Sequence, residues 1–534
     1  MEFYSRRSNV IAKNGAVATS QPLAAQSGLE ILKKGGNAVD AAVATAAVLN
    51  VVEPMSTGIG GDVFALVRNS KDRVVKAMNG SGRSGSYANP DFLIQKGYDA
   101  IPKSGLQGIY SVSVPGTVHG WETLLNDEGS MTLEDVLKPA IKYAFEGFGV
   151  SEIIANSWNS SVEKISVNGP NEFLPLGKAP KVGYLLKLEE LGETLSNISQ
   201  NGSKEFYQGH IADKIIKFVE SLGGWITKED LANHSTAWVE PIHTKYRDVE
   251  IWECPPNGQG IAALIALNIL ENFNVSEFGF QTAETFHHSI EAMRLAFADS
   301  LQYISDPNSN YIPVNELISK NYAKARSELI NRNKRLNDVS FGNPLHYSDT
   351  VYISVIDAEG NACSLINSLY ESFGSGLLVP GTGIFLQNRG SLFSLDPKHP
   401  NYLSSNQLPY HTIIPAIATK NEDLWLSFGV MGGFQQPQGH LQVVMNMVDF
   451  DLNPQQSLDA PRFRVDLETD TVWLEDQLPE EISKTLKNFG HQVKMMSGEQ
   501  RMQFGGGQIL EKKLDSGLVV GGSDSRKDGC VVGW

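Results

Sequence analysis

The sequence has very few cysteines, and this scarcity excludes two classes of protein. Only three occur among 534 residues, namely Cys254, Cys363 and Cys530. They lie far apart, so they fit neither a disulfide framework nor a zinc site with paired ligand spacing. We expect small buried apolar residues at these positions, and the sequence implies no metal ion.

Long apolar runs and positive charge are also lacking. No stretch of 18 or more apolar residues is present, so no segment is predicted to cross a membrane. The first twenty residues contain no apolar run of signal-peptide length, which predicts a cytoplasmic protein. The formal net charge of -16 repels phosphate backbones. Nucleic acid is therefore not an expected partner, and small molecules are favoured.

The length of 534 residues exceeds that of one ordinary hydrophobic core, yet no shift in composition divides the chain. We expect either two domains or one large layered α/β body built from two segments. Apolar residues at helical spacing predict a helix over residues 22–34, which ends at Gly35 and Gly36. The alanine-rich stretch 38–52 predicts a second helix, packed closely between layers.

The middle of the chain, residues 130–335, has a mostly helical pattern. His287 and His288 lie within it, and nothing pairs them with metal-ligand spacing, so we expect ordinary helix histidines. The polar, aperiodic stretch 331–348 predicts an exposed connection. Near the amino end, the glycine cluster at residues 57–62 leads into a strand pattern instead of a helix, which disfavours a nucleotide-binding loop.

A strand is predicted to begin at Thr350. Residues 351–356 alternate in character, as a half-buried strand requires. Residues 357–361 predict a three-residue hairpin turn with Gly360 at the positive-φ position. In that register Ser368 lies opposite Thr350. A contact between two hydroxyls across strands is by itself a common structural feature.

The position of Thr350, between an exposed connection and a buried strand, indicates a chemical role. Cleavage of the bond between Asp349 and Thr350 would give Thr350 a free α-amine with a pKa of roughly 7.7 to 8.0. Such an amine can take the proton of the residue's own hydroxyl and make it a nucleophile near neutral pH. We therefore infer that Thr350 both cuts the chain and attacks an amide.

Acyl transfer also requires hydrogen-bond donors directed at the developing oxyanion. A predicted strand at 424–428, followed by Gly432 and Gly433 and by a helix that starts near Pro437, provides a candidate. Paired glycines let two backbone N–H groups point inward without obstruction by side chains. A plain strand-to-helix turn is the alternative interpretation of these glycines.

Several long segments carry a resemblance to one known family. They are AVATSQPLAAQSGLEILKKGGNAVDAAVAT near the start, STGIGGD, SVPGTVHGW, PPNGQGIAALIALNILEN, TVYISVIDAEGNA, ESFGSG and MGG. On these segments the chain resembles the γ-glutamyltranspeptidase family over nearly its whole length. The resemblance implies an α/β (α+β) fold, the four-layer αββα sandwich of N-terminal-nucleophile hydrolases, with no metal or organic cofactor.

The resemblance also implies autocatalytic cleavage of one precursor into two associated subunits. Residues 1–349 would form the large subunit and residues 350–534 the small subunit. Thr350 would be the nucleophile, Ser368 would match the threonine that hydrogen-bonds it, and the two glycines, Gly432 and Gly433, would match the oxyanion-hole glycines.

The chain departs from the family pattern where substrate is held. Typical γ-glutamyl enzymes bind the α-carboxylate of the substrate with an arginine in an Arg-Glu-x-Ala-Pro segment and with a Ser-Ser pair. The corresponding stretch here, residues 79–85, places Arg83 near that position, and the serines become His411 and Thr412. Recognition of the α-carboxylate is therefore expected to differ.

The group that holds the α-amine is also changed. The family uses an Asn and a Gln-x-x-Asp set, whereas Tyr370, Arg389 and Leu392 occupy those places here. Loss of the acid removes the partner of an ammonium, and Arg389 would repel one. A guanidinium suits a carboxylate on the acyl side, which is similar to members related to oxamate amidohydrolase and glutaryl-type cephalosporin acylases. A structural ion-pair role for Arg389 is the alternative.

These features favour a hydrolase or acyltransferase that acts on amides of small acids and releases the acyl group to water or to an acceptor amine. Two other readings stay open: a true γ-glutamyl hydrolase or transferase for glutathione-like substrates, and a non-catalytic binding protein that kept the fold. A nucleotide-dependent oxidoreductase is disfavoured by the strand that follows the glycine cluster. The natural amide, the acceptor and the oligomeric state are left open.

Overall fold

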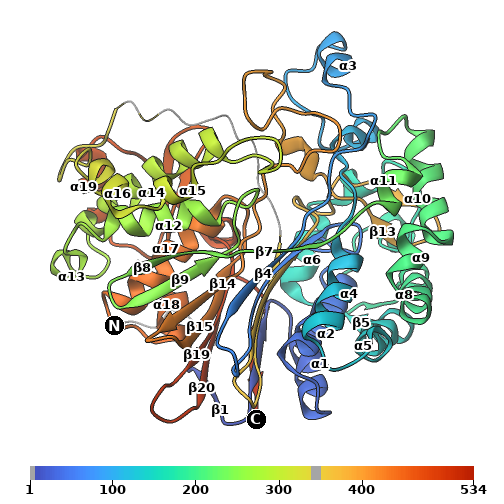
Figure 1. Cartoon of the computed structure of the whole chain (residues 1–534), viewed down its shortest axis with the longest axis horizontal. Helices are drawn as coiled ribbons and strands as arrows, with labels where there is room; N and C mark the ends of the chain where they lie inside the picture. The colour runs from blue at the N-terminus through green and yellow to red at the C-terminus, as the bar shows by residue number, and fades with distance from the viewer. Residues whose placement is uncertain (1–6, 338, 340–349) are drawn as a thin grey trace.

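Two stacked β-sheets form the centre of the molecule, and helices cover both outer faces (Figure 1). The computed structural model describes residues 7–337, 339 and 350–534. Asp349, on one side of the predicted cleavage site, lies outside the described residues, as do residues 340–348 of the predicted connection. Among the described residues, no helix combines the length and the apolar character needed to cross a membrane.

One sheet runs in the order β1-β20-β19-β15-β14-β9-β8, and all of its pairings are antiparallel. Its strands are β1 (Val10–Ala12), β8 (Ile242–Tyr246), β9 (Val249–Glu253), β14 (Ala416–Lys420), β15 (Asp423–Val430), β19 (Gly507–Lys512) and β20 (Val519–Ser523).

The other sheet runs in the order β21-β2-β10-β11-β3-β4-β7 and is also antiparallel throughout. Its strands are β2 (Ala16–Thr19), β3 (Asp62–Arg68), β4 (Val75–Gly80), β7 (Ala237–Val239), β10 (Val351–Ile356), β11 (Ala362–Ser368) and β21 (Cys530–Gly533). Strands from both sides of the 349/350 junction alternate here, because β10 and β11 lie between β2 and β3.

Three small sheets lie outside the central pair. They consist of β5 (Phe148–Gly149) with β6 (Leu185–Leu186), β12 (Leu378–Val379) with β13 (Ile384–Phe385), and β16 (Phe463–Asp466) with β17 (Thr471–Glu475) and β18 (Gln492–Met496).

The first helical layer, at the right of Figure 1, shares one large apolar core with the outer face of the β10 sheet. It contains α1 (Pro22–Lys33), α2 (Ala38–Val52), α4 (Thr117–Glu128), α5 (Leu133–Glu146), α6 (Glu152–Asn159), α7 (Val162–Ile165), α8 (Glu189–Asn201), α9 (Ser203–Tyr207), α10 (His210–Ser221) and α11 (Lys228–Ala232). Every residue of α2 is buried, as the alanine-rich sequence predicts. A short helix, α3 (Pro90–Gln95), packs separately.

The second helical layer covers the β15 sheet around another core, at the left of Figure 1. It contains α12 (Gly260–Leu270), α13 (Val275–Phe278), α14 (Ala283–Tyr303), α15 (Val314–Leu317), α16 (Lys320–Ser327), α17 (Gln435–Val448), α18 (Pro454–Asp459) and α19 (Glu480–Asn488). Short 3-10 helices are η1 (Leu106–Ser111), η2 (Pro175–Gly177), η3 (Arg389–Leu392) and η4 (Gly498–Phe504). The arrangement is the four-layer αββα sandwich.

Strand β10 differs from the half-buried strand that its alternating sequence predicts. All six of its residues are buried. Val351 and Ile353 belong to the first helical core, whereas Tyr352 belongs to a separate apolar cluster that also contains Phe64 and Ile417. Because the strand is central and the sheets are stacked, its second face meets protein instead of water.

Candidate active site

Thr350 immediately precedes β10, at the end of a buried hairpin. Asp357 N–H donates to the Asn361 carbonyl at 3.1 Å, and β10 pairs with β11 in the register predicted from the turn. This register brings the Thr350 and Ser368 hydroxyl oxygens to 3.1 Å. Ser368 Oγ also accepts the N–H of Tyr370 at 2.8 Å, so the backbone fixes its position.

Gly432 and Gly433 lie in the turn between β15 and α17. Their φ angles are +122° and +61°, in the region that favours glycine. Among the described residues, neither backbone N–H has a hydrogen-bond acceptor. The backbone N–H of Gln436 donates to the Gly433 carbonyl at 3.0 Å. A rigid turn with two unpaired amides has the character of an oxyanion-binding site.

A cavity of 310 Å³ connects the threonine with this turn. Its wall includes both Thr350 and Gly432. The remaining lining residues are polar, charged or flexible, and they come from several elements: Asn156, Ser157, Ser160, Ser372, Met431, Arg464, Glu499, Met502, Gln503, Gly505 and Lys527. The hydroxyl-bearing Thr350 and the backbone of Gly432 therefore border the same space.

Arg389 lies fully buried at the start of η3, next to Tyr370. Its guanidinium carbon is 4.6 Å from the centre of the Tyr370 ring, and its Nη1 donates to Thr412 Oγ1 at 2.6 Å. Among the described residues, Nε and Nη2 of Arg389 and the hydroxyl of Tyr370 have no hydrogen-bond partner. Burial lowers the pKa of Arg389 to about 10, which leaves it charged at neutral pH. Tyr370 itself has a left-handed backbone, with φ +79°.

His411 is paired with a buried acid that sequence reasoning did not single out, Asp62. His411 Nε2 lies 3.0 Å from Asp62 Oδ2, and His411 Nδ1 accepts the N–H of Ile413 at 3.4 Å, so the ring is a neutral donor to the acid. Burial, and then Arg389, lower the pKa of His411 well below its usual range. Burial raises the pKa of Asp62 to about 7, although Arg389 and hydrogen bonds act in the opposite direction.

A second residue not assigned from the sequence, Gln259, joins the two parts of the site. Its Nε2 donates to the Thr412 carbonyl at 2.7 Å and to the Gly433 carbonyl at 2.8 Å. Both Asp62 and Gln259 lie in family-like segments, STGIGGD and PPNGQGI, and that was the signal available for them.

Arg83, a predicted substrate residue, and Leu392, which occupies the place of the family's acid, lie away from the threonine cavity. Arg83 pairs with Asp306 at 2.6 Å and lines a separate cavity of 650 Å³. Leu392 lines a third cavity, of 440 Å³, together with Phe393. The structure thus brings together Thr350, Ser368 and Gly432, and places Tyr370, Arg389, His411 and Thr412 beside them through Ser368 and Gln259.

Comparison with known proteins decides the family. The family model described as gamma-glutamyltranspeptidase matches residues 24–534. The chain belongs to this family. It is similar to the glutathione hydrolase-like YwrD proenzyme of Bacillus subtilis (strain 168), with 37% identity over 532 residues that cover 98% of this chain and 99% of the relative.

Two other proteins that are similar to this chain have different names. The oxamate amidohydrolase proenzyme of Klebsiella pneumoniae is 31% identical over 541 residues, which are 99% of this chain and 100% of the relative. The solved cephalosporin acylase from Bacillus halodurans is 43% identical, covers 100% of this chain and 98% of its own, and superposes with a TM-score of 0.92. The protein is therefore an enzyme, an amidohydrolase or acylase of the N-terminal-nucleophile type.

Proposed function

We propose that the enzyme cuts itself between Asp349 and Thr350 and then uses Thr350 to hydrolyse or transfer the acyl group of a small-acid amide. The fragments would comprise residues 1–349 and 350–534, held together by the shared sheets. The observation that carries this proposal is the hydrogen bond of 3.1 Å between the hydroxyls of Ser368 and Thr350, since Thr350 lines a cavity whose wall also contains Gly432.

The proposed reaction needs only groups of this chain. The α-amine of the cleaved Thr350 takes the proton of Oγ1, which attacks the amide carbon and forms a tetrahedral oxyanion. The N–H groups of Gly432 and Gly433 stabilise this charge. The C–N bond then breaks, the departing amine takes the proton, and an ester of Thr350 remains. Water or an acceptor amine attacks this ester in the same way and frees the hydroxyl.

Arg389 supports an acyl group that carries a carboxylate and lacks an α-amine. Among the described residues Arg389 forms no ion pair and interacts only at longer range with Asp62, and its Nε and Nη2 form one edge that can bind a carboxylate bidentately. The Tyr370 hydroxyl would add a third donor. Oxamate, in the name of one relative, has a carboxylate beside its amide, which agrees with this class.

A γ-glutamyl substrate is the second candidate, because one similar relative is named a glutathione hydrolase-like protein. The ammonium of a γ-glutamyl group would have to lie near Arg389, which disfavours it by repulsion between like charges. Glutaryl and γ-glutamyl 4-nitroanilides separate the two candidates, since both release the same chromophore. We expect the glutaryl compound to have the larger kcat/KM.

Cleavage is tested by denaturing electrophoresis with amino-terminal sequencing of the wild type, Thr350→Ala and Thr350→Ser. We expect two fragments from the wild type, the smaller beginning at Thr350, and one uncut chain of 58.3 kDa from Thr350→Ala. Thr350→Ser keeps a hydroxyl and should still be cut. Fully active wild-type protein with an intact 349/350 bond would refute the mechanism.

A further inference from the structure

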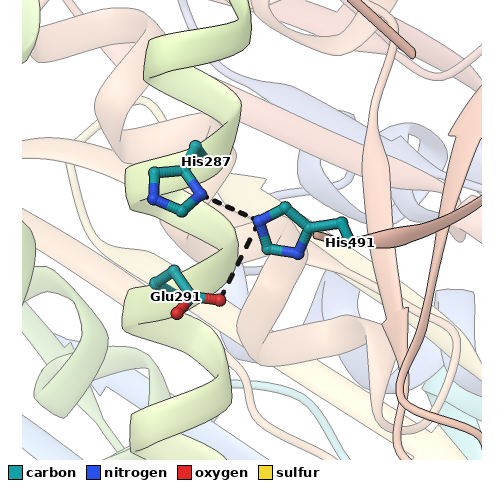
Figure 2. Close-up of side chains that lie close together, drawn as sticks. All are labelled: His287, Glu291 and His491. Carbon is teal, nitrogen blue, oxygen red and sulfur yellow. Dashed lines mark hydrogen bonds and ion pairs between the residues drawn. The ribbon is translucent and has the colours of Figure 1, made fainter. Parts of the chain in front are cut away.

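A buried cluster in the first half of α14 joins three parts of the chain. His287 and Glu291 lie one turn apart on this helix, and both are directed at His491, which immediately precedes β18 (Figure 2). His287 Nδ1 and His491 Nε2 are 2.8 Å apart, and His491 Nε2 is 4.0 Å from Glu291 Oε1. All three side chains are buried.

The direction of each hydrogen bond in the cluster follows from its acceptors. His287 Nε2 lies 2.7 Å from the Asn331 carbonyl, so this nitrogen carries the proton and donates. His287 Nδ1 is therefore an acceptor, and His491 Nε2–H donates to it. Burial lowers the pKa of His287, and burial with nearby His287 and Arg294 lowers that of His491 to about 2, so both rings stay neutral.

The charges around the cluster already balance. Glu291 Oε1 accepts from Arg294 at 2.8 Å, while Arg294 Nη2 and Arg335 both pair with Asp470. Two cations thus face two anions in a region of low dielectric. A divalent metal ion would add two uncompensated charges next to Arg294, which makes the cluster a poor cation site although its ligand atoms lie within 4.8 Å of one another.

The cluster holds the last described stretch before the 349/350 junction. Glu291 Oε2 accepts the N–H of Leu336 at 2.8 Å, and Arg294 Nη1 donates to the Leu336 carbonyl at 3.0 Å. Arg335 N–H donates to the Phe489 carbonyl at 2.7 Å. Residues 331–336 are therefore fixed both to α14 and to the end of α19.

The other side of the cluster leads directly to the wall of the Thr350 cavity. From His491 the chain continues through β18 into η4, which supplies Glu499, Met502 and Gln503 to that wall. Arg464 of β16 lines the same cavity, and its Nη1 donates to the Gln503 carbonyl at 2.7 Å. The β16–β18 sheet and η4 thus form one unit.

We propose that His287, Glu291 and His491 form a positioning joint, through which α14 and residues 331–336 hold the β16–β18 sheet and η4 in place as one wall of the catalytic cavity. The joint acts on the part of the cavity wall that η4 and Arg464 form. This assignment rests on the proposed function of Thr350. The residues of the joint touch no substrate and act through η4.

The decisive variants differ by one hydrogen bond. His491→Ala removes the donor to His287 Nδ1, whereas His491→Gln keeps an Nε2 donor in a similar place. We expect His491→Ala to raise KM about fivefold or more for whichever anilide the wild type hydrolyses, with kcat within about twofold, and His491→Gln to restore KM. Glu284→Gln is the matched control, because it removes an ion pair between α14 and Arg332 and leaves the contacts of His491 in place.

Hydrogen exchange measured by mass spectrometry tests the joint without using activity. Residues 492–504 should exchange about tenfold faster or more in His491→Ala, and at the wild-type rate in His491→Gln and Glu284→Gln. If His491→Ala does not fold, His287→Gln serves instead, because it keeps the donor to Asn331 and removes the acceptor for His491.

Three results would overturn the joint: equal behaviour of His491→Ala and His491→Gln, faster exchange with unchanged KM, or one equivalent of bound metal in elemental analysis of the purified wild type. Failure of the proposed function is seen separately, as hydrolysis that survives Thr350→Ala. In that case the exchange data still report on the joint, and the KM data refer to a different nucleophile.

Discussion

Thr350 and Arg389 lie in two parts of the candidate site that satisfy their side chains differently. The hydroxyls of Thr350 and Ser368 bond to each other at the ends of central strands. Arg389 is equally buried, yet two of its three nitrogens and the neighbouring Tyr370 hydroxyl have no partner among the described residues. Buried polar groups are nearly always paired. The Thr350 part is therefore satisfied by the fold itself, and we expect a ligand to complete the Arg389 part.

The largest effect is expected from closing the proposed oxyanion site beside Thr350. Gly432→Ala would place a Cβ in a backbone with φ +122°, 3.2 Å from Gly505 Cα, and would displace the turn. We expect kcat to fall about 100-fold to 1000-fold, measured by steady-state hydrolysis. Gly35→Ala is the control, because its φ of +94° imposes similar strain with no atom within 4 Å. Equal loss in both variants would remove the special role of Gly432.

Removal of the Arg389 charge tests the Arg389 part of the site alone. Arg389→Gln should lower kcat/KM about 30-fold to 100-fold for an acyl group with a carboxylate, because a bidentate charged pair is lost. An uncharged acyl group of similar size should lose less than about threefold, and self-cleavage should continue. Arg83→Gln, in a separate cavity, is the matched control. If both acyl groups suffer equally, Arg389 is structural and the contrast between the two parts disappears.

Ser368→Ala removes a side chain that forms hydrogen bonds both with Thr350 and with the backbone of Tyr370, the neighbour of Arg389. Thr350 loses its hydroxyl partner, and the Tyr370 N–H loses its acceptor. We expect kcat to fall about tenfold and the free energy of unfolding to fall by about 1–3 kcal/mol, because a buried donor is left unpaired. Urea unfolding and steady-state kinetics measure the two effects. Ser368→Thr keeps the hydroxyl, so activity far below that of the wild type would argue against the hydrogen bond as the cause.

The smallest effect concerns pH. Below about pH 7 Asp62 is neutral, so the charge of Arg389 is unopposed; above it Asp62 ionises and opposes anion binding. KM for a carboxylate-bearing acyl group should therefore rise a few-fold as pH increases through about 7, and Asp62→Asn should flatten this profile. Stability should fall as pH rises from about 4 to about 7, because ionisation of the buried Asp62 carboxyl is unfavourable in the folded protein. A KM that falls with rising pH in the wild type would contradict the assignment.

Local patterns predicted that Thr350 and Ser368 lie side by side. The turn at 357–361 fixed the register that places Ser368 opposite Thr350, and this register is confirmed. Partners distant in sequence were beyond such patterns, because the contact between Asp62 and His411 spans 349 positions. The spacing of His287 gave no sign of His491 for the same reason. The full burial of β10 was also missed, since alternation cannot reveal that a second sheet covers the polar face.

Strands from either side of the 349/350 junction alternate in both large sheets, as in the order β2-β10-β11-β3 and in the pairings β1-β20 and β14-β9. A cut at this junction therefore changes connectivity without creating two separable bodies. Dissociation of one polypeptide from the other would break ladders in both sheets and expose both helical cores to water. The cleaved enzyme should melt in a single cooperative transition that is insensitive to dilution over the usual range of protein concentration.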